Sequence, residues 1–193
     1  MDDWVDQGVE PPPSKYPRLE NGGLVTLEEF RRTFPIIPGL PAPTQKNELD
    51  VLDFGPLFGA NGGVKTVEPP RHGRSYPILI PRASPEGYAQ IGIDTIWTRA
   101  PLGTNVGWNF RKGERASELC ILSGSYIPLA STTAERIAGG DPRPSLQERY
   151  GNHRGFVNAV RRATFDLVRE GFLLHEDAKI FVDAAEASDV LDK

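Results

Sequence analysis

The sequence is poor in sulfur and in long apolar runs. Among its 193 residues it holds one methionine and one cysteine, Cys120, which excludes an internal disulfide and leaves the compartment unknown. No stretch approaches the ~18 consecutive apolar residues of a membrane span, and the N-terminal region lacks the apolar core of a signal peptide. We therefore expect a chain without a membrane partner and without an export signal in these residues.

The sequence also lacks an excess of positive charge. Its formal net charge is −4, and the basic residues are dispersed except for short pairs such as Arg31-Arg32 and Arg161-Arg162. A nucleic-acid-binding surface needs clustered Lys and Arg, so no nucleic-acid partner is expected. The glycine-rich run 59–63 lacks the Lys-Ser/Thr of a phosphate loop and is predicted to be a flexible loop, and we expect no cofactor.

Glycine and proline are abundant instead. The 20 Gly and 18 Pro residues indicate long irregular connections between rather few regular elements. The remaining composition, with 38% hydrophobic and 25% charged residues, is that of a globular chain. We expect a loop-rich fold with a real hydrophobic core.

The N-terminal quarter is predicted to be a helix end followed by a connector. Residues 1–10 read as the last turns of a helix, with Gly8 as its C-terminal cap. Three prolines then open a Pro-rich connector over residues 11–48. Within it, Thr26 is the expected N-cap of a two-turn helix, and residues 36–43 are expected to form a strap across another surface.

The next two segments differ in periodicity. Residues 49–111 are predicted to be a small β region, with strands near 49–54, 76–80, 89–96 and 104–110 and a turn at 84–87. Residues 112–193 are predicted to be a loop followed by two helices, over 145–171 and 176–187. Ser145 should cap the first helix, and the shared seam should include Phe156, Val160, Leu167 and Phe181. The predicted fold class is α+β: a small antiparallel hairpin or sheet followed by a C-terminal helical pair.

No residue pattern indicates a complete hydrolytic site. The nucleophile turn of an α/β-hydrolase reads G-x-S-x-G between a strand and a helix, and that motif is absent. The nearest match surrounds Ser75, lacks the second glycine, and is interpreted as a loop serine. His72, His153 and His175 lack partners at metal-ligand spacing, and Cys120 sits among apolar neighbours, so none is assigned to catalysis or to metal binding.

Two stretches, residues 101–111 and 118–128, have a more varied composition than a structural scaffold requires. Each mixes an aromatic residue with glycines and short polar side chains, which is typical of a pocket wall. The alternative is structural, with the aromatics as anchors and the polar side chains satisfying loop backbone. The candidate substrate-binding residues are Trp108, Asn109, Arg111, Ser123, Ser125 and Tyr126.

Several motifs resemble the C-terminal region of bacterial α/β-hydrolase-domain proteins. They are residues 107–111, 118–128 and 140–151, together with the opening residues 4–19, and they occur in the family's order. The resemblance implies that the nucleophile, acid and histidine lie upstream of the helix that ends at Gly8. None of the three can be carried over onto this sequence.

The resemblance therefore predicts a C-terminal extension of an α/β-hydrolase that supplies pocket wall and stability but no catalytic group. Its partners would be an upstream hydrolase portion, from the same or a neighbouring gene, and a small-molecule carboxylic ester. The alternative hypothesis is a stand-alone binding or interaction module. Upstream sequence that encodes G-x-S-x-G would favour the first, and an unrelated neighbouring gene would favour the second.

Overall fold

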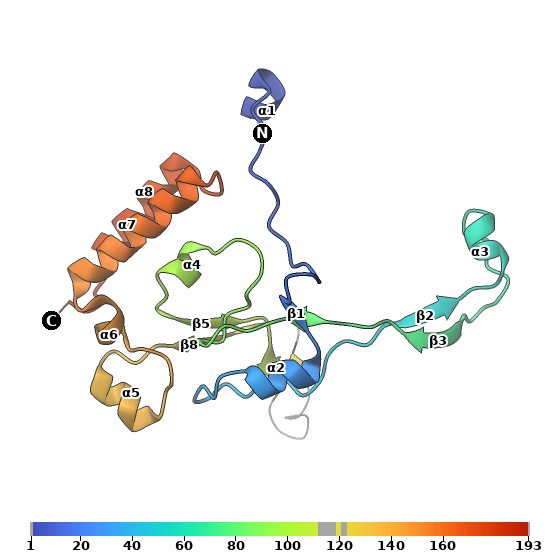
Figure 1. The fold of residues 1–193 in the computed structure, drawn as a ribbon, viewed down its shortest axis with the longest axis horizontal. Coiled ribbons are helices and arrows are strands. Elements are labelled where there is room, and N and C mark those ends of the chain that lie inside the picture. Colours follow the sequence, from blue (N-terminus) through green and yellow to red (C-terminus); the bar gives the residue numbers. More distant parts are fainter. Residues whose placement is uncertain (1, 112–118, 121–122, 193) are drawn as a thin grey trace.

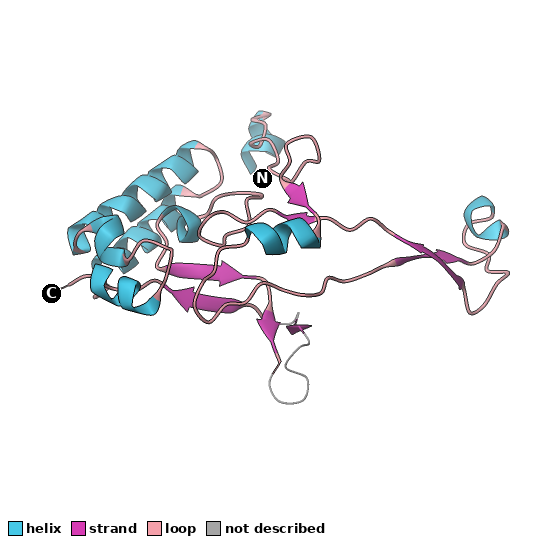
Figure 2. Ribbon diagram, turned by 60° about the horizontal axis from the view of Figure 1, so that its bottom comes forward, coloured by secondary structure: helices cyan, strands magenta, loops and turns pink. Residues whose placement is uncertain are grey.

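The computed structural model describes residues 2–192 except 112–118 and 121–122, with residues 2, 3, 119 and 120 described by their backbone alone. A pair of long helices forms one end of the molecule, a two-stranded arm projects from the other, and short strands and helices lie between them (Figures 1 and 2). The N-terminal connector leads away from this body and ends in α1, Asp2–Gln7 (Figure 1). Gly8 ends that helix at φ 69°, as its sequence predicts.

The strands form two-stranded antiparallel sheets. The pairs are β1 (Leu24–Val25) with β4 (Ile80–Pro81), β2 (Asp50–Asp53) with β3 (Arg71–Ser75), β5 (Gly103–Val106) with β8 (Ser125–Pro128), and β6 (Asn109–Phe110) with β7 (Leu119–Cys120). Together with the helices they make an α+β fold, as predicted. The β5–β8 hairpin joins residues from the third and fourth predicted segments.

Two expected strands are displaced. Residues 89–96 run as a loop into α4, Ile96–Arg99, and residues 76–79 lie between β3 and β4. The turn at 84–87 does form, because the Gly87 amide donates to the Ser84 carbonyl at 2.9 Å and Ala83 bridges Ala89. Ser75 ends β3 and is therefore a strand residue, which corrects its interpretation as a loop serine.

The helix predicted over residues 145–171 is divided into two helices in the structure. Ser145 caps α6 (Leu146–Tyr150) through the predicted capping box with Glu148. Gly151, at φ 76°, then ends this helix, and Asn152 caps α7 (His153–Arg169) anew by accepting from the Gly155 amide. The last helix is α8, His175–Glu186. An unpredicted helix, α5 (Thr133–Gly139), precedes this group with its own capping box.

The seam between α7 and α8 forms the larger of two apolar clusters. Phe156, Val160 and Leu167 are buried there, and Phe181 packs against them half-buried. Phe156, Val160 and Leu167 are spaced by four and seven residues, which places them on one face of α7, as the sequence predicts. Ile96 of α4 joins the same cluster, so the helical end is attached to the middle of the molecule.

The second cluster surrounds α2 (Leu27–Thr33), which Thr26 caps as predicted. Phe30, Ile37 and Leu40 are buried in it together with Val106 of β5. The strap at residues 36–43 was expected to lie across another surface, and it lies against this cluster, where Ile37 and Leu40 are buried. The two residues bridge each other across a tight turn, which directs both side chains into the cluster.

The arm consists of β2, β3 and the short helix α3, Leu57–Ala60, at its tip (Figures 1 and 2). Phe54 and Phe58 stack there with ring centroids 4.8 Å apart. Part of the run 59–63, expected to be a flexible loop, thus belongs to a helical turn. Isolated two-stranded ribbons are marginal in water, so this small stacked cluster is the arm's own source of order.

Candidate functional site

The β5–β8 hairpin presents Tyr126 to a cavity of about 570 Å³ that Tyr88 and Trp97 also line. Asn105 pairs with Tyr126 across the hairpin and lies on the same face. The Tyr126 ring packs directly over Gly103, where a Cβ atom would come within 2.5 Å of the ring. Glycine is therefore required at position 103 for the ring to adopt this position.

Tyr88 stands at the inner wall of this cavity. Its hydroxyl donates to the Gly103 carbonyl at 2.7 Å, and the Ser84 hydroxyl accepts from its amide at 3.1 Å. Burial raises the pKa of Tyr88 to about 12, so the phenol stays neutral at physiological pH. Tyr88 is therefore a fixed, uncharged wall.

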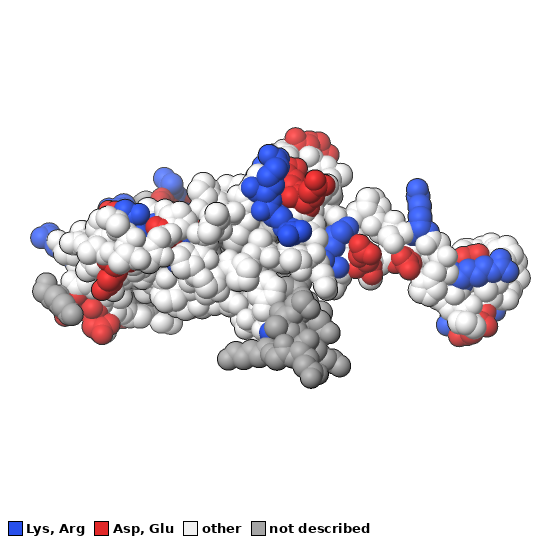
Figure 3. All heavy atoms as spheres, turned by 90° about the horizontal axis from the view of Figure 1, so that it is seen from below, with Lys and Arg blue, Asp and Glu red and all other residues white. Residues whose placement is uncertain are grey.

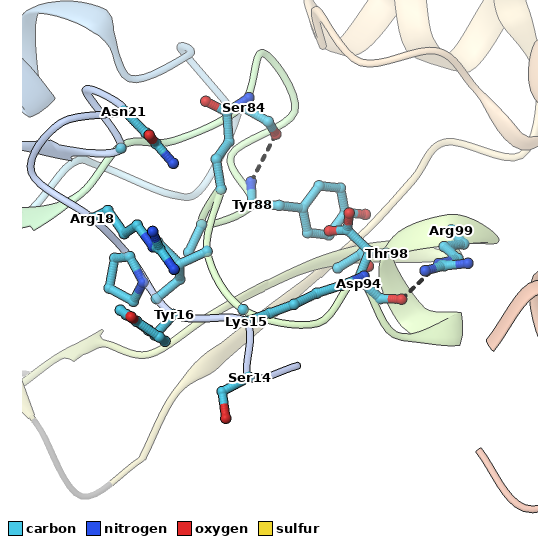
Figure 4. Close-up of a pocket in the computed structure, with 16 residues that line it drawn as sticks. Ser14, Lys15, Tyr16, Arg18, Asn21, Ser84, Tyr88, Asp94, Thr98 and Arg99 are labelled. Atoms are coloured by element: carbon cyan, nitrogen blue, oxygen red, sulfur yellow. Dashed lines mark hydrogen bonds between the residues drawn. The ribbon is translucent and has the colours of Figure 1, made fainter. Parts of the chain in front are cut away.

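A second cavity, of about 620 Å³, also has Tyr88 in its lining, together with Lys15, Arg18, Arg99 and Asp94 (Figure 4). In Figure 4, Lys15 reaches toward Thr98 and Arg99, whereas Arg18 lies on the Asn21 side. Lys15 and Arg99 both bind Glu170 at the end of α7, each at 2.9 Å. The Arg99 and Lys15 hydrogen bonds lower the pKa of Glu170 to about 2.

A buried arginine fixes the hairpin that carries Tyr126. Arg143 is 1% exposed and forms a two-pronged ion pair with Asp141, with Nη2 2.6 Å from Oδ2 and Nε 2.9 Å from Oδ1. Its Nη1 also donates to the Thr104 hydroxyl on β5 and to the Ile127 carbonyl on β8. One guanidinium thus joins both hairpin strands to the loop before α6, which positions the cavity wall.

Trp108 faces a different, apolar cavity of about 550 Å³, lined among others by Phe30, Ile80 and Leu49. Its ring meets Phe30 edge-on at 5.9 Å, and its indole N–H donates to the Pro41 carbonyl at 3.4 Å. Lys46 is the cation in this lining, and its Nζ donates to the Ile78 carbonyl. Trp108 therefore combines an anchoring contact with exposure to a cavity.

The six predicted substrate-binding residues are thus not brought to one pocket. Trp108 and Tyr126 line separate cavities, and the Ser125 hydroxyl is used to bind the Trp108 carbonyl at 2.9 Å. The Asn109 side chain accepts from the Phe110 amide in an exposed β6. Arg111 and Ser123 are exposed beside the residues that the structure leaves undescribed. Whether any of the six binds substrate stays a prediction.

Sequence reasoning missed Tyr88, Trp97, Arg18 and Arg99. Trp97 follows directly after the strand that was expected over residues 89–96, and so belonged to no predicted element. In the structure it lies in α4. Lys15 and Arg18 lie in the connector, where no periodicity marks a functional face. Only the folded chain brings these residues together with the hairpin.

Charge of both signs is mixed over the face shown in Figure 3, without an extended patch of one sign among the residues drawn in colour. The described residues contain no helix long and apolar enough to cross a membrane. Within the same residues, no group of His, Cys, Asp and Glu side chains is arranged to hold a metal ion.

Comparison with known families supplies the class of protein. The matching family is described as an alpha/beta hydrolase domain, and its model covers residues 1–183. The chain belongs to the alpha/beta hydrolase domain family. No curated protein and no solved structure matches it. The family resemblance read from the motifs of the sequence is thereby confirmed.

One serine, one histidine and one aspartate of this hydrolase-family chain do meet, on the arm. Ser75 donates to Asp50 Oδ1 at 2.7 Å, and His72 Nδ1 lies 3.0 Å from Asp50 Oδ2. The hydrogen bonds from Ser75 and His72 lower the pKa of Asp50. A hydrolase triad needs the histidine between serine and acid, so that the imidazole takes the serine proton. Here the aspartate stands in the middle, and the cluster is a cross-strand contact on an exposed ribbon.

The other histidines are engaged in ways that suit structure. His153 Nδ1 lies 3.0 Å from the Val190 carbonyl and ties the start of α7 to the chain beyond α8. His175 opens α8 on an exposed surface. The side chain of Cys120 lies outside the described residues.

Proposed function

We propose that this chain supplies a wall of the substrate pocket in an alpha/beta hydrolase that cleaves carboxylic esters, and that the catalytic groups come from other chain segments. The single observation that carries the proposal is the cavity beside Tyr126, in a chain whose family is the alpha/beta hydrolase domain. Its lining is mostly aromatic and apolar with a few hydrogen-bonding groups, which suits an ester.

The hydrogen bonds of three serine hydroxyls support a non-catalytic role for this chain. Ser75 donates to Asp50, Ser125 to the Trp108 carbonyl, and Ser145 to the Glu148 carboxylate of its helix cap. A nucleophile needs a free hydroxyl beside a base, and each of these three hydroxyls is engaged in a structural contact.

The sheet architecture supports the same division of labour. The hydrolase nucleophile sits on a sharp turn between a strand and a helix at the top of an α/β sheet. In the part of the chain that the structure describes, the sheets are two-stranded and antiparallel. We therefore assign the nucleophile, acid and base to an upstream hydrolase portion as partner.

The test is the kinetics of ester cleavage by this chain co-expressed with the product encoded immediately upstream. Tyr126→Ala should raise KM for p-nitrophenyl butyrate about tenfold, because it removes an aromatic contact of the bound ester. Tyr76→Ala is the matched control, since Tyr76 on the arm and Tyr126 are both 53% exposed. Equal kinetics for the two variants would contradict the proposed wall.

The second candidate function is a stand-alone binding module. It is favoured by one observation: residues of this chain alone form two cavities of small-molecule size around Tyr88. In that case no combination with an upstream product would yield turnover, while the chain alone would still bind a ligand.

A further inference from the structure

The two cavities adjoin at Tyr88. Tyr88, Ala89 and Thr98 line both of them, so the shared wall has cations on one side and aromatic rings on the other. We call the two adjoining cavities together the polar–aromatic cleft. Its two volumes, about 620 and about 570 Å³, each fall in the range of small-molecule sites.

The aromatic end offers exposed rings that are held in place from behind. Trp97 is 58% exposed, and its ring packs edge-on against Phe181 of α8 at 6.2 Å. Tyr126 is held over Gly103 by the close approach described above. Rings that are fixed yet exposed favour stacking with a planar ligand, because little side-chain entropy is lost on binding.

The cationic end contains one cation without an anionic partner among the described residues. Lys15 and Arg99 are engaged by Glu170. The Arg18 guanidinium instead lies 5.0 Å from the centre of the Tyr16 ring, and within the described chain no carboxylate pairs with it. A guanidinium binds a carboxylate through two parallel hydrogen bonds.

We propose that the polar–aromatic cleft binds aromatic monocarboxylates, with the ring against Trp97 and Tyr126 and the carboxylate at Arg18. Asp94 in the lining, and Glu170 through its pairing with Lys15 and Arg99, offset part of the positive charge, which favours a singly charged ligand over a phosphate. This inference goes beyond the proposed function, because it concerns binding by this chain alone and is tested without turnover.

The first measurement is titration calorimetry of the full 193-residue chain with 2-naphthoate and with the neutral 2-naphthamide. The naphthoate should bind about tenfold more tightly, because the charge-assisted hydrogen bond to Arg18 is missing in the amide. Acetate, which has the charge without the ring, should bind more weakly still. Equal affinity for naphthoate and naphthamide, or no binding at about 10 mM ligand, would overturn the proposal.

Matched variants test each end of the cleft. Arg18→Gln and Tyr126→Ala should each weaken naphthoate binding about tenfold. Arg74→Gln and Tyr76→Ala on the exposed arm change the same residue types and should leave binding within about twofold. The assignment of the binding site to the cleft is contradicted if all four variants lose affinity. It is also contradicted if both cleft variants keep their affinity.

Nuclear magnetic resonance locates the ligand independently of any variant. The chain has 3 tryptophans, so the indole N–H signals of Trp4, Trp97 and Trp108 can be assigned one by one. Naphthoate should shift the Trp97 signal through ring currents and leave the other two in place. A shift at Trp108 instead would place the ligand in the apolar cavity and overturn the proposed site.

Discussion

At the scale of residues, a few charged side chains determine how the site is held. Arg143 is the most buried of them, and its partners belong to both strands of the β5–β8 hairpin and to the loop before α6. Burial acts to raise the pKa of Asp141, but the hydrogen bonds and charge of Arg143 outweigh it and hold that pKa below its ordinary value. The pair is therefore ionised, and neither partner can be lost alone without leaving a buried charge.

Arg143→Ala should lower the free energy of unfolding by about 3–5 kcal/mol, because it leaves Asp141 buried without its counter-ion. Arg169→Ala is the control, since Arg169 forms a surface pair with Asp166 and is 67% exposed. That change should cost less than about 1 kcal/mol. Urea denaturation of the two variants would measure both values, and similar losses would contradict the structural role of Arg143.

Glu170 makes stability depend on pH. Its pKa is lowered from 4.5 to about 2 in the folded chain by Arg99 and Lys15. Because the folded pKa is depressed, the stabilisation is fully present above pH 4.5 and is lost as the pH falls toward about 2. Glu170→Gln should therefore flatten the decline of the urea midpoint between pH 5 and pH 3, and Arg99→Gln should do the same. An unchanged decline in both variants would show that the ion pair does not form in solution.

At the scale of elements, much could be predicted from local chemistry. Thr26 and Ser145 begin helices where the sequence places them, because a cap acts through the backbone amides of the next turn. The seam of Phe156, Val160 and Leu167 followed from helical spacing. The break at Gly151 could not be predicted in this way. The helix ends there because of the backbone conformation of Gly151, and the apolar pattern of the sequence continues across that break.

The elements that could not be predicted depend on distant partners. Ile37 and Leu40 are buried against the neighbouring α2 and also against Val106 of β5, which no window of the local sequence includes. The same holds for the cleft, where Arg18 and Tyr126 come from segments far apart in the sequence. Composition identified Trp108 and Tyr126 as candidates, but in the structure they line separate cavities.

The seam between α7 and α8 can be tested with two phenylalanines of one helix. Phe156→Ala should lower the free energy of unfolding by about 3 kcal/mol, because the side chain is buried among apolar neighbours. Phe165→Ala, at a position that is 66% exposed, should cost well under half as much. Phe181→Ala should fall between them, because Phe181 is half-buried. Thermal or urea unfolding gives the order, and equal losses at 156 and 165 would contradict the seam.

At the scale of the whole molecule, a compact middle carries parts that reach away from it. The helix α1 and the arm lie away from this middle (Figure 1). Trp4 and Val5 are exposed on α1, and Leu57 and Phe58 are exposed on the arm. Apolar surface of this kind often marks an interface. It accords with the proposal that an upstream hydrolase portion covers part of this surface, while the cleft around Tyr88 stays open to a ligand.

The most direct test of that account is the hydrolysis of p-nitrophenyl esters by the purified chain alone and by the chain co-expressed with the upstream hydrolase portion. We expect turnover above the buffer control only for the combination, because we propose that an activated serine and its base come from the upstream portion. Turnover should vanish when the serine of the upstream G-x-S-x-G motif is changed to alanine. Saturable hydrolysis by this chain alone, abolished by Ser75→Ala, Ser123→Ala or Ser125→Ala, would contradict the account.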